Sequence, residues 1–208
     1  MHDEAITSSQ RAALSALKPA VALGFYLAGG TALCLRLAHR RSIDLDLFCD
    51  GPFDPESLLD ELNAKGVYAS NPRSKPNTLW IDVEDVPISF MRFPYPCLLP
   101  TEPGLGFPIA TLADIAAMKI EAIASRGARK DFYDLYFICK ESGGLQFALE
   151  AFEKRYRSAH PDLMHRLKAL TFFDDAEAEP DPILLKRVDW QLVRDFFERE
   201  VRIIWAKR

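Results

Sequence analysis

The sequence lacks any apolar run of the roughly 20 residues that a membrane-spanning helix needs. It also lacks the basic and apolar start of a signal peptide, because its first residues (His2, Asp3 and Glu4) are polar or acidic. Cysteine is scarce, with four in 208 residues and no C-x-x-C pair. These absences exclude a membrane partner, and they predict a cytoplasmic protein with buried thiols.

Excess positive charge is missing as well. The formal net charge is −4, so the chain has no overall signature of a nucleic-acid-binding protein. Any contact with nucleic acid must therefore come from a local patch. What is present is an ordinary balance of 49% hydrophobic and 27% charged residues, which predicts a globular chain with a sizeable core.

The first half of the chain alternates between helical and extended patterns. Apolar spacing predicts helices at 8–17 (capped by Ser8 or Ser9), 31–37 and 55–65, and strands at 25–27, 44–48, 67–69, 79–83 and 86–91. The last two strands form a hairpin that turns at Glu84 and Asp85. This order predicts an α+β or α/β first half of the chain.

A long, proline-rich and irregular connection is predicted over 94–108, and it marks the predicted domain boundary. Beyond it the pattern becomes helical, with helices predicted at 111–125, 131–140, 145–157, 161–170 and 189–206, and a solvated loop at 174–181. We therefore expect one domain over 1–110 and a helical region over 111–208.

The most informative motif is the turn Gly29-Gly30-Thr31, which opens a helix and is followed by a strand that carries Asp44 and Asp46. Backbone N–H groups of such a turn and the helix dipole favour a phosphate. Gly-Gly-Thr by itself is more often a tight turn with a helix cap. The strand that follows, which carries two carboxylates, favours the phosphate-binding interpretation of the turn.

Side chains alternate along a strand, so Asp44 and Asp46 are predicted to share one face, while Ile43, Leu45 and Leu47 point into a core. Two adjacent carboxylates repel each other unless a cation lies between them, and oxygen ligands of this kind suit Mg²⁺. A pair of exposed strand carboxylates is the simpler alternative.

A second polar block lies on the helices after the boundary. Lys119 lies beside an apolar helix face, so it either snorkels to solvent or reaches a phosphate in a cleft. Arg126, Arg129 and Lys130 form a basic cluster that suits a triphosphate or an RNA backbone, or a solvated helix start. Asp131 follows this cluster, where an acid also stabilises a first helical turn.

Together these motifs resemble the nucleotidyltransferases of the AbiEii/AbiGii toxin type, relatives of the DNA polymerase β superfamily. The resemblance covers residues 25 to 140 and includes Lys119-Ile120-x-Ala122, Arg126 and Arg129-Lys130-Asp131-x-x-Asp134-Leu135-Tyr136. It implies an α+β fold, in which a polymerase β-like core with a mixed sheet and flanking helices is followed by a helical C-terminal region. The implied reaction moves a nucleoside monophosphate from an NTP to an acceptor hydroxyl, with a tRNA 3′ end as an acceptor and a cognate antitoxin as a partner.

The resemblance also implies roles for individual residues. It makes Asp44 and Asp46 ligands of Mg²⁺ (or Mn²⁺), and it makes Asp46, Lys119 and Asp131 catalytic, with Lys119 and Asp131 contributed to the cleft by the helical region. Asp134 would orient a base or anchor a loop. The residues implied in nucleotide binding are Gly29, Gly30, Thr31, Arg41, Ser42, Lys119, Arg129 and Lys130.

One position departs from the pattern of many polymerase β relatives, which carry a third carboxylate on the strand beside the Asp-x-Asp strand. Here that place is predicted to hold Ser89, and Asp82 lies on the same face but displaced along the sheet. The general base therefore stays open between Asp46, Asp131 and the metal-bound acceptor hydroxyl. Two alternatives follow: a transferase that acts on a small molecule or a protein, and a non-catalytic module that binds a nucleotide or a partner.

Overall fold

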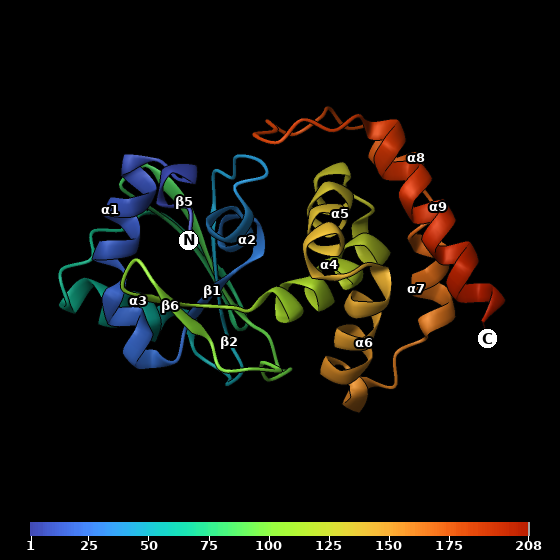
Figure 1. The fold of residues 1–208 in the computed structure, drawn as a ribbon. Helices are drawn as coiled ribbons and strands as arrows, with labels where there is room; N and C mark the ends of the chain where they lie inside the picture. The colour runs from blue at the N-terminus through green and yellow to red at the C-terminus, as the bar shows by residue number, and fades with distance from the viewer. Residues whose placement is uncertain (208) are drawn as a thin grey trace. The chain divides into compact units, whose positions relative to one another are not determined.

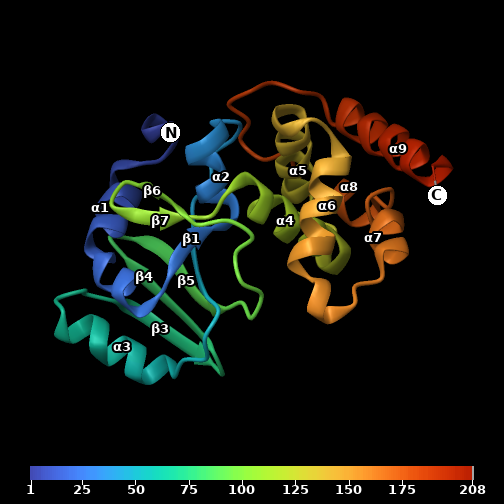
Figure 2. The ribbon, with the colours of Figure 1, turned by 60° about the horizontal axis from the view of Figure 1, so that its bottom comes forward.

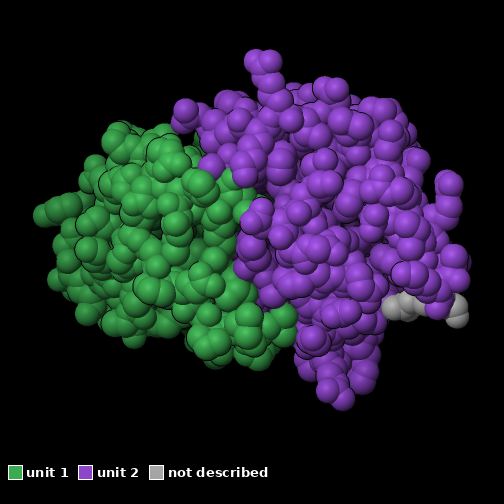
Figure 3. Space-filling model, in the orientation of Figure 1, with its two compact units in different colours: residues 1–37, 42–111 green, residues 38–41, 112–208 purple. Residues whose placement is uncertain are grey.

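The computed structural model describes residues 1–207. The chain forms two compact units, which Figure 3 colours separately. Unit 1 consists of residues 1–37 and 42–111, and unit 2 of residues 38–41 and 112–208. The assignment of the short segment 38–41 to the helical unit does not follow from the sequence pattern.

Unit 1 contains a seven-stranded mixed sheet (Figures 1 and 2). Its strands, in spatial order, are β3 (Ser70–Lys75), β4 (Thr78–Val83), β5 (Val86–Arg92), β2 (Leu45–Cys49), β1 (Tyr26–Ala28), β7 (Phe107–Ile109) and β6 (Glu102–Gly104). Strand β2 pairs with β5 and β1 with β7 in parallel, and the other pairs are antiparallel. The predicted α+β class with a mixed sheet is confirmed.

The helices of unit 1 follow their sequence signals closely. They are α1 (Ser8–Ala16), α2 (Gly29–Leu37) and α3 (Pro55–Ala64), with short 3-10 turns at Asp3–Ala5 and Lys18–Leu23. The Asp54 carboxylate caps α3 by accepting from the Ser57 N–H. The cap of α1 is Thr7 rather than Ser8 or Ser9, because the Thr7 hydroxyl and the Gln10 side chain form a reciprocal capping box.

Alternation along β4 and β5 gives the sheet one covered and one more open face. Ile81 and Phe90 are buried on the covered face, where Phe90 packs against Phe25 and Phe25 packs against Phe53, just before α3. Helices α1 and α3 contact these strands (Figure 2). The alternate residues Trp80 and Ser89 stay half-exposed.

Three expectations for unit 1 were wrong. Residues 67–69 form no strand, and the edge strand is β3 instead, although its polar sequence carries no apolar alternation. The proline-rich connection contains the hairpin of β6 and β7, which pairs with β1. Ile43 is 76% exposed rather than buried, because β2 begins only at Leu45 and the alternation does not extend back to it.

Unit 2 is helical. Its helices are α4 (Leu112–Arg126), α5 (Arg129–Ser142), α6 (Leu145–Arg155), α7 (Leu163–Ala169), α8 (Asp174–Glu177) and α9 (Trp190–Ala206), with a 3-10 turn at Arg157–Ala159. Helix α8 lies in the segment expected to be a solvated loop, where Ala176 is buried. The ring of Phe132 packs against those of Phe173, Trp190 and Phe197. Over residues 1–207, no helix is long and apolar enough to cross a membrane.

A buried ion pair joins α4 to α6. The Arg155 Nη1 atom lies 2.9 Å from Asp114 Oδ1 and donates to the Asp114 carbonyl oxygen at 3.0 Å, and both side chains have no exposed surface. Removing one partner of a buried pair lowers the free energy of unfolding more than removing one partner of an exposed pair, because the remaining buried charge is left without an opposite charge.

We expect Arg155→Ala to lower the free energy of unfolding by about 3–5 kcal/mol. The matched control is Arg166→Ala, which breaks the more exposed pair with Glu121 and should cost less than about 1 kcal/mol. Urea unfolding of the two variants measures both values. Equal losses would contradict the importance assigned to the buried pair.

Candidate functional site

The glycine turn of unit 1 brings the backbone against one carboxylate of the Asp-x-Asp motif. Gly29 follows β1 directly and has a φ of +68°, a conformation that side chains other than glycine rarely adopt. A Cβ atom at this position would lie only 2.5 Å from Asp46 Oδ2. Glycine is therefore required here both by the backbone conformation and by the close approach of Asp46.

Asp44 is held by two hydroxyl groups. The Ser42 hydroxyl donates to Asp44 Oδ1 at 3.0 Å, and the buried Thr31 hydroxyl donates to the Asp44 carbonyl oxygen. Ser42 is fixed in turn, because the buried Gln10 amide donates to its carbonyl oxygen at 2.9 Å. Thr31 thus ties the start of α2 to the segment before β2, a structural role beside the predicted contact with phosphate.

The strand register defines the neighbours of Asp46. Asp46 lies opposite Ala28 on β1 and opposite Ser89 on β5. Ser89 therefore occupies the place expected for a third carboxylate. Asp82 pairs with Pro87, so it shares the face of Ser89 but is displaced along the sheet, as expected. Within residues 1–207, no group of three or more His, Cys, Asp or Glu side chains gathers as a metal site.

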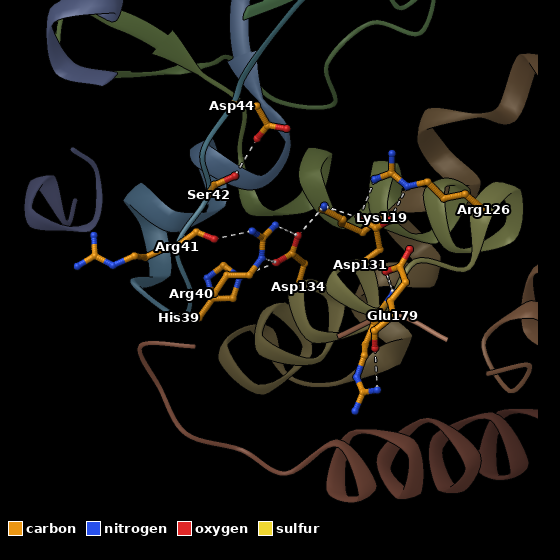
Figure 4. Close-up of polar contacts among 11 residues, drawn as sticks. His39, Arg40, Arg41, Ser42, Asp44, Lys119, Arg126, Asp131, Asp134 and Glu179 are labelled. Atoms are coloured by element: carbon orange, nitrogen blue, oxygen red, sulfur yellow. Dashed lines mark hydrogen bonds and ion pairs between the residues drawn. The ribbon is translucent and has the colours of Figure 1, made fainter. Parts of the chain in front are cut away.

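A second polar cluster lies in unit 2 and is centred on the fully buried Asp134 (Figure 4). Its carboxylate lies 2.5 Å from Lys119 Nζ and accepts from Arg40 through Nε at 2.6 Å and Nη2 at 2.8 Å. His39 Nε2 lies 2.6 Å from Asp134 Oδ1. Asp134 thus receives three nitrogen-bearing side chains from α4 and from the segment 38–41.

These contacts shift the pKa values of the cluster. Burial alone would raise the pKa of Asp134, but the charges of Lys119 and Arg40 outweigh it and hold that pKa well below its ordinary value. Burial would lower the pKa of Lys119, and the charges of Asp134 and Asp131 hold it above its ordinary value. Burial lowers the pKa of His39. The cluster is therefore charged at neutral pH, with Lys119 as a cation and Asp134 as an anion.

Asp131 belongs to the same network. It lies 2.7 Å from Lys119 Nζ and accepts from Arg126 through Nε at 2.7 Å and Nη2 at 3.0 Å. Burial opposes its ionisation, but the charges of Lys119 and Arg126 lower its pKa. Sequence reasoning named Lys119 and Asp131 as site residues, and the structure places the two in direct contact inside unit 2.

The segment 38–41 is also fastened through its backbone. The Arg41 N–H donates to the Ile183 carbonyl oxygen at 2.8 Å, and the His39 carbonyl oxygen accepts from the N–H groups of Leu185 and Lys186. The segment ends three residues before Asp44, the first carboxylate of the Asp-x-Asp motif. The anchored segment therefore leads into the motif.

His39 and Arg40 are structural residues that the sequence analysis missed. The only available signal was the basic run that they form with Arg41, and it could not reveal a partner 94 or 95 residues away. The side chain of Arg41 itself is exposed.

The remaining predicted basic residues take different positions in unit 2. Arg129 Nε pairs with Asp181 at 2.7 Å, and the Arg129 guanidinium lies 4.7 Å from the centre of the Trp190 ring. Lys130 is exposed, and the side chain of Arg126 is 55% exposed although it binds Asp131. Arg129 is thus engaged in packing, while Lys130 faces solvent.

We expect Gly29→Ala to displace the Asp46 carboxylate, because the new methyl group would meet it at 2.5 Å. The strained backbone should also cost about 1 kcal/mol or more of stability. The control is Gly24→Ala, which has a similarly positive φ but open space around its Cβ position. The measurement is the rate of the nucleotidyl transfer that the resemblance implies. A lower rate in Gly29→Ala but not in Gly24→Ala would support the close approach of Asp46, and equal rates would contradict it.

We expect Asp134→Asn to lower the free energy of unfolding at pH 7 by about 3–5 kcal/mol, because Lys119 and Arg40 lose their shared anion. The pKa of Asp134 is lowered in the folded state, so its contribution is complete above the ordinary value of 3.8 and disappears as the pH falls below it. The variant should therefore lose less stability than the wild type between pH 5 and about pH 2. Urea unfolding at several pH values measures this, with the exposed Asp60→Asn as the control. If the two proteins lost the same free energy of unfolding over this pH range, the lowered pKa of Asp134 would be contradicted.

The sequence of this chain is similar to those of known proteins. The sequence pattern of the family described as "Nucleotidyl transferase AbiEii toxin, Type IV TA system" matches residues 12–79 and 67–206. An uncharacterized protein of Aquifex aeolicus (strain VF5), aq_aa25, is 38% identical over 202 residues, which cover 90% of this chain and 93% of that protein.

Two solved structures share the fold at low sequence identity. MenT4, a nucleotidyltransferase toxin from Mycobacterium tuberculosis H37Rv, superposes with a TM-score of 0.59 at 18% identity, covering 90% of this chain and 81% of that chain. JHP933 from Helicobacter pylori superposes with a TM-score of 0.54 at 18% identity, covering 99% of this chain and 93% of that chain. The family pattern spans nearly the whole sequence, and the chain therefore belongs to the AbiEii nucleotidyltransferase toxin family of type IV toxin–antitoxin systems.

Proposed function

We propose that this enzyme transfers a nucleoside monophosphate from an NTP to an acceptor hydroxyl, and that a tRNA 3′ end provides this hydroxyl. The observation that carries the proposal is the convergence of two motifs in unit 1. The glycine turn lies against the Asp46 carboxylate, and Thr31 and Ser42 both bind Asp44. A phosphate-binding turn beside a pair of carboxylates suits a triphosphate with its divalent cation.

The donor set fits Mg²⁺ or Mn²⁺. Asp44 and Asp46 are both half-exposed, so their oxygens can be reached from solvent. Mg²⁺ is commonly held by one or two carboxylates together with substrate phosphates and water, and it does not need a closed cage of protein ligands. When bound, such an ion neutralises charge on the triphosphate. Asp44 and Asp46 would hold it.

In the proposed reaction the acceptor hydroxyl oxygen forms a bond to the α-phosphorus of the NTP. The bond between the α-phosphorus and the oxygen that bridges it to the β-phosphate breaks, and pyrophosphate leaves. The hydroxyl proton passes to the Asp46 carboxylate, which we assign as the general base. This choice follows from the position of Ser89, because β5 offers no carboxylate beside Asp46.

The other predicted site residues complete the proposal. The N–H groups of the turn at Gly29 and Gly30 would bind phosphate oxygens, and the exposed side chains of Arg41 and Lys130 would add positive charge. The catalytic role of Lys119 and Asp131 stays a prediction of the resemblance. Their contacts give both a further role, since they help to neutralise the cluster around Asp134.

Membership of a type IV toxin–antitoxin family leads us to propose a cognate antitoxin as the partner that limits this activity.

We expect Asp44→Asn and Asp46→Asn to lower the rate of transfer by about 10²–10⁴-fold while the fold is kept, because each removes charge at the site of the metal or the base. The assay mixes protein, Mg²⁺ or Mn²⁺, each α-labelled NTP in turn and total tRNA. Asp60→Asn on the exposed face of α3 is the matched control. Unchanged transfer in both site variants would refute the residue assignment, and label on a small molecule or on protein would refute the tRNA acceptor.

A further inference from the structure

A row of side chains crosses the sheet of unit 1 from Asp46 toward the edge. Asp46 on β2 is opposite Ser89 on β5, Ser89 is opposite Trp80 on β4, and Trp80 is opposite Arg73 on β3. Residues directly opposite each other on paired strands point to the same face. Neighbouring strands are about 4.8 Å apart, so Trp80 lies two strands, or about 10 Å, from Asp46 on the face of the Asp46 carboxylate.

Trp80 is half-exposed on this face, whereas its neighbours Leu79 and Ile81 are buried on the other. The residue that separates it from Asp46 is Ser89, a small side chain that is also half-exposed. A flat ligand can therefore lie on the Trp80 ring while the chain it belongs to continues toward Asp46.

Positive charge accompanies the ring. Lys75 Nζ lies 5.1 Å from the centre of the Trp80 ring, and Arg73 is the cross-strand partner of Trp80. Both basic side chains are exposed, and β3 carries no acidic residue. Charged residues are expected on an edge strand because they prevent pairing with another sheet. That explanation covers Arg73 and Lys75, but it gives no reason for a large aromatic ring on the more open face.

Aromatic rings on a sheet face, flanked by basic side chains, bind single-stranded nucleic acid by stacking bases and pairing with phosphates. The net charge of the whole chain is −4, so any contact with nucleic acid must be local. Trp80 with Lys75 and Arg73 provides such a local basic surface. A ring about 10 Å from Asp46 suits the next unit of a polymeric acceptor better than an acceptor of one unit.

We propose that Trp80, Lys75 and Arg73 form an acceptor subsite that stacks an unpaired base of a polynucleotide whose 3′ end lies at Asp46. Trp80 supplies the stacking surface, and Lys75 and Arg73 contact the phosphate backbone. The proposal rests on the proposed function for the position of the reacting end, and it adds the part of the chain that selects a single-stranded polynucleotide as acceptor.

The test separates binding from catalysis. The full-length protein is titrated, without NTP or metal, with a fluorescent single-stranded ribo-oligonucleotide that ends in cytidine-cytidine-adenosine, and anisotropy gives the dissociation constant. Trp80→Ala should bind about tenfold or more weakly, Trp80→Phe should retain most of the affinity, and Lys75→Gln should reduce the salt dependence. The matched control is Trp205→Ala, which removes an exposed tryptophan on α9. Thermal unfolding confirms that each variant is folded.

Transfer kinetics on the same proteins provide the second readout. Trp80→Ala should raise KM for tRNA with little change in KM for the NTP, a split that a merely structural role of the ring would not produce. Equal affinity of Trp80→Ala and wild type for the oligonucleotide would overturn the subsite, as would absence of binding by the wild type. If the wild type binds through Trp80 but transfers no nucleotide to tRNA, the subsite stands and the proposed function fails. If the wild type transfers nucleotide to tRNA, and Trp80→Ala binds the oligonucleotide and transfers nucleotide equally well, the proposed function stands and the subsite fails.

Discussion

A buried carboxylate must be neutralised, and in this protein Asp134 imposes that requirement on unit 2. Lys119 and Arg40 supply the opposite charge, and His39 completes the contacts. Taking such charges out of water is expensive, so the arrangement persists only if every partner is in place. The consequence reaches beyond α4 and α5, because Arg40 belongs to the segment 38–41, which ends three residues before Asp44 in the chain.

In unit 1 the backbone closely approaches a carboxylate, and one face of the sheet is partly exposed to solvent. Gly29 allows the backbone to meet Asp46, and hydroxyl groups of Thr31 and Ser42 fix Asp44 from two directions. The same sheet buries one face under helices and leaves Trp80 half-exposed on the other. Asp46 lies on β2, the fourth of the seven strands, and on the same face of the sheet as Trp80.

Sequence patterns predicted what depends on local spacing. The hairpin of β4 and β5, the Asp54 cap of α3 and the position of Ser89 opposite Asp46 are confirmed, because alternation and capping act over a few residues. The edge strand β3 escaped prediction, since tertiary pairing overrides its polar sequence. The partners of Asp134 escaped as well, because ion pairs over 94 or 95 residues leave no trace in local periodicity.

A phosphate label distinguishes transfer of a nucleotide, with release of pyrophosphate, from other reactions of an NTP. The enzyme is incubated with tRNA and with one NTP labelled either at the α- or at the γ-phosphate. We expect the α-label to enter the tRNA, one per 3′ end at each addition, and the γ-label to leave as pyrophosphate. Label from the γ-phosphate on the tRNA would indicate phosphoryl transfer and would refute nucleotidyl transfer.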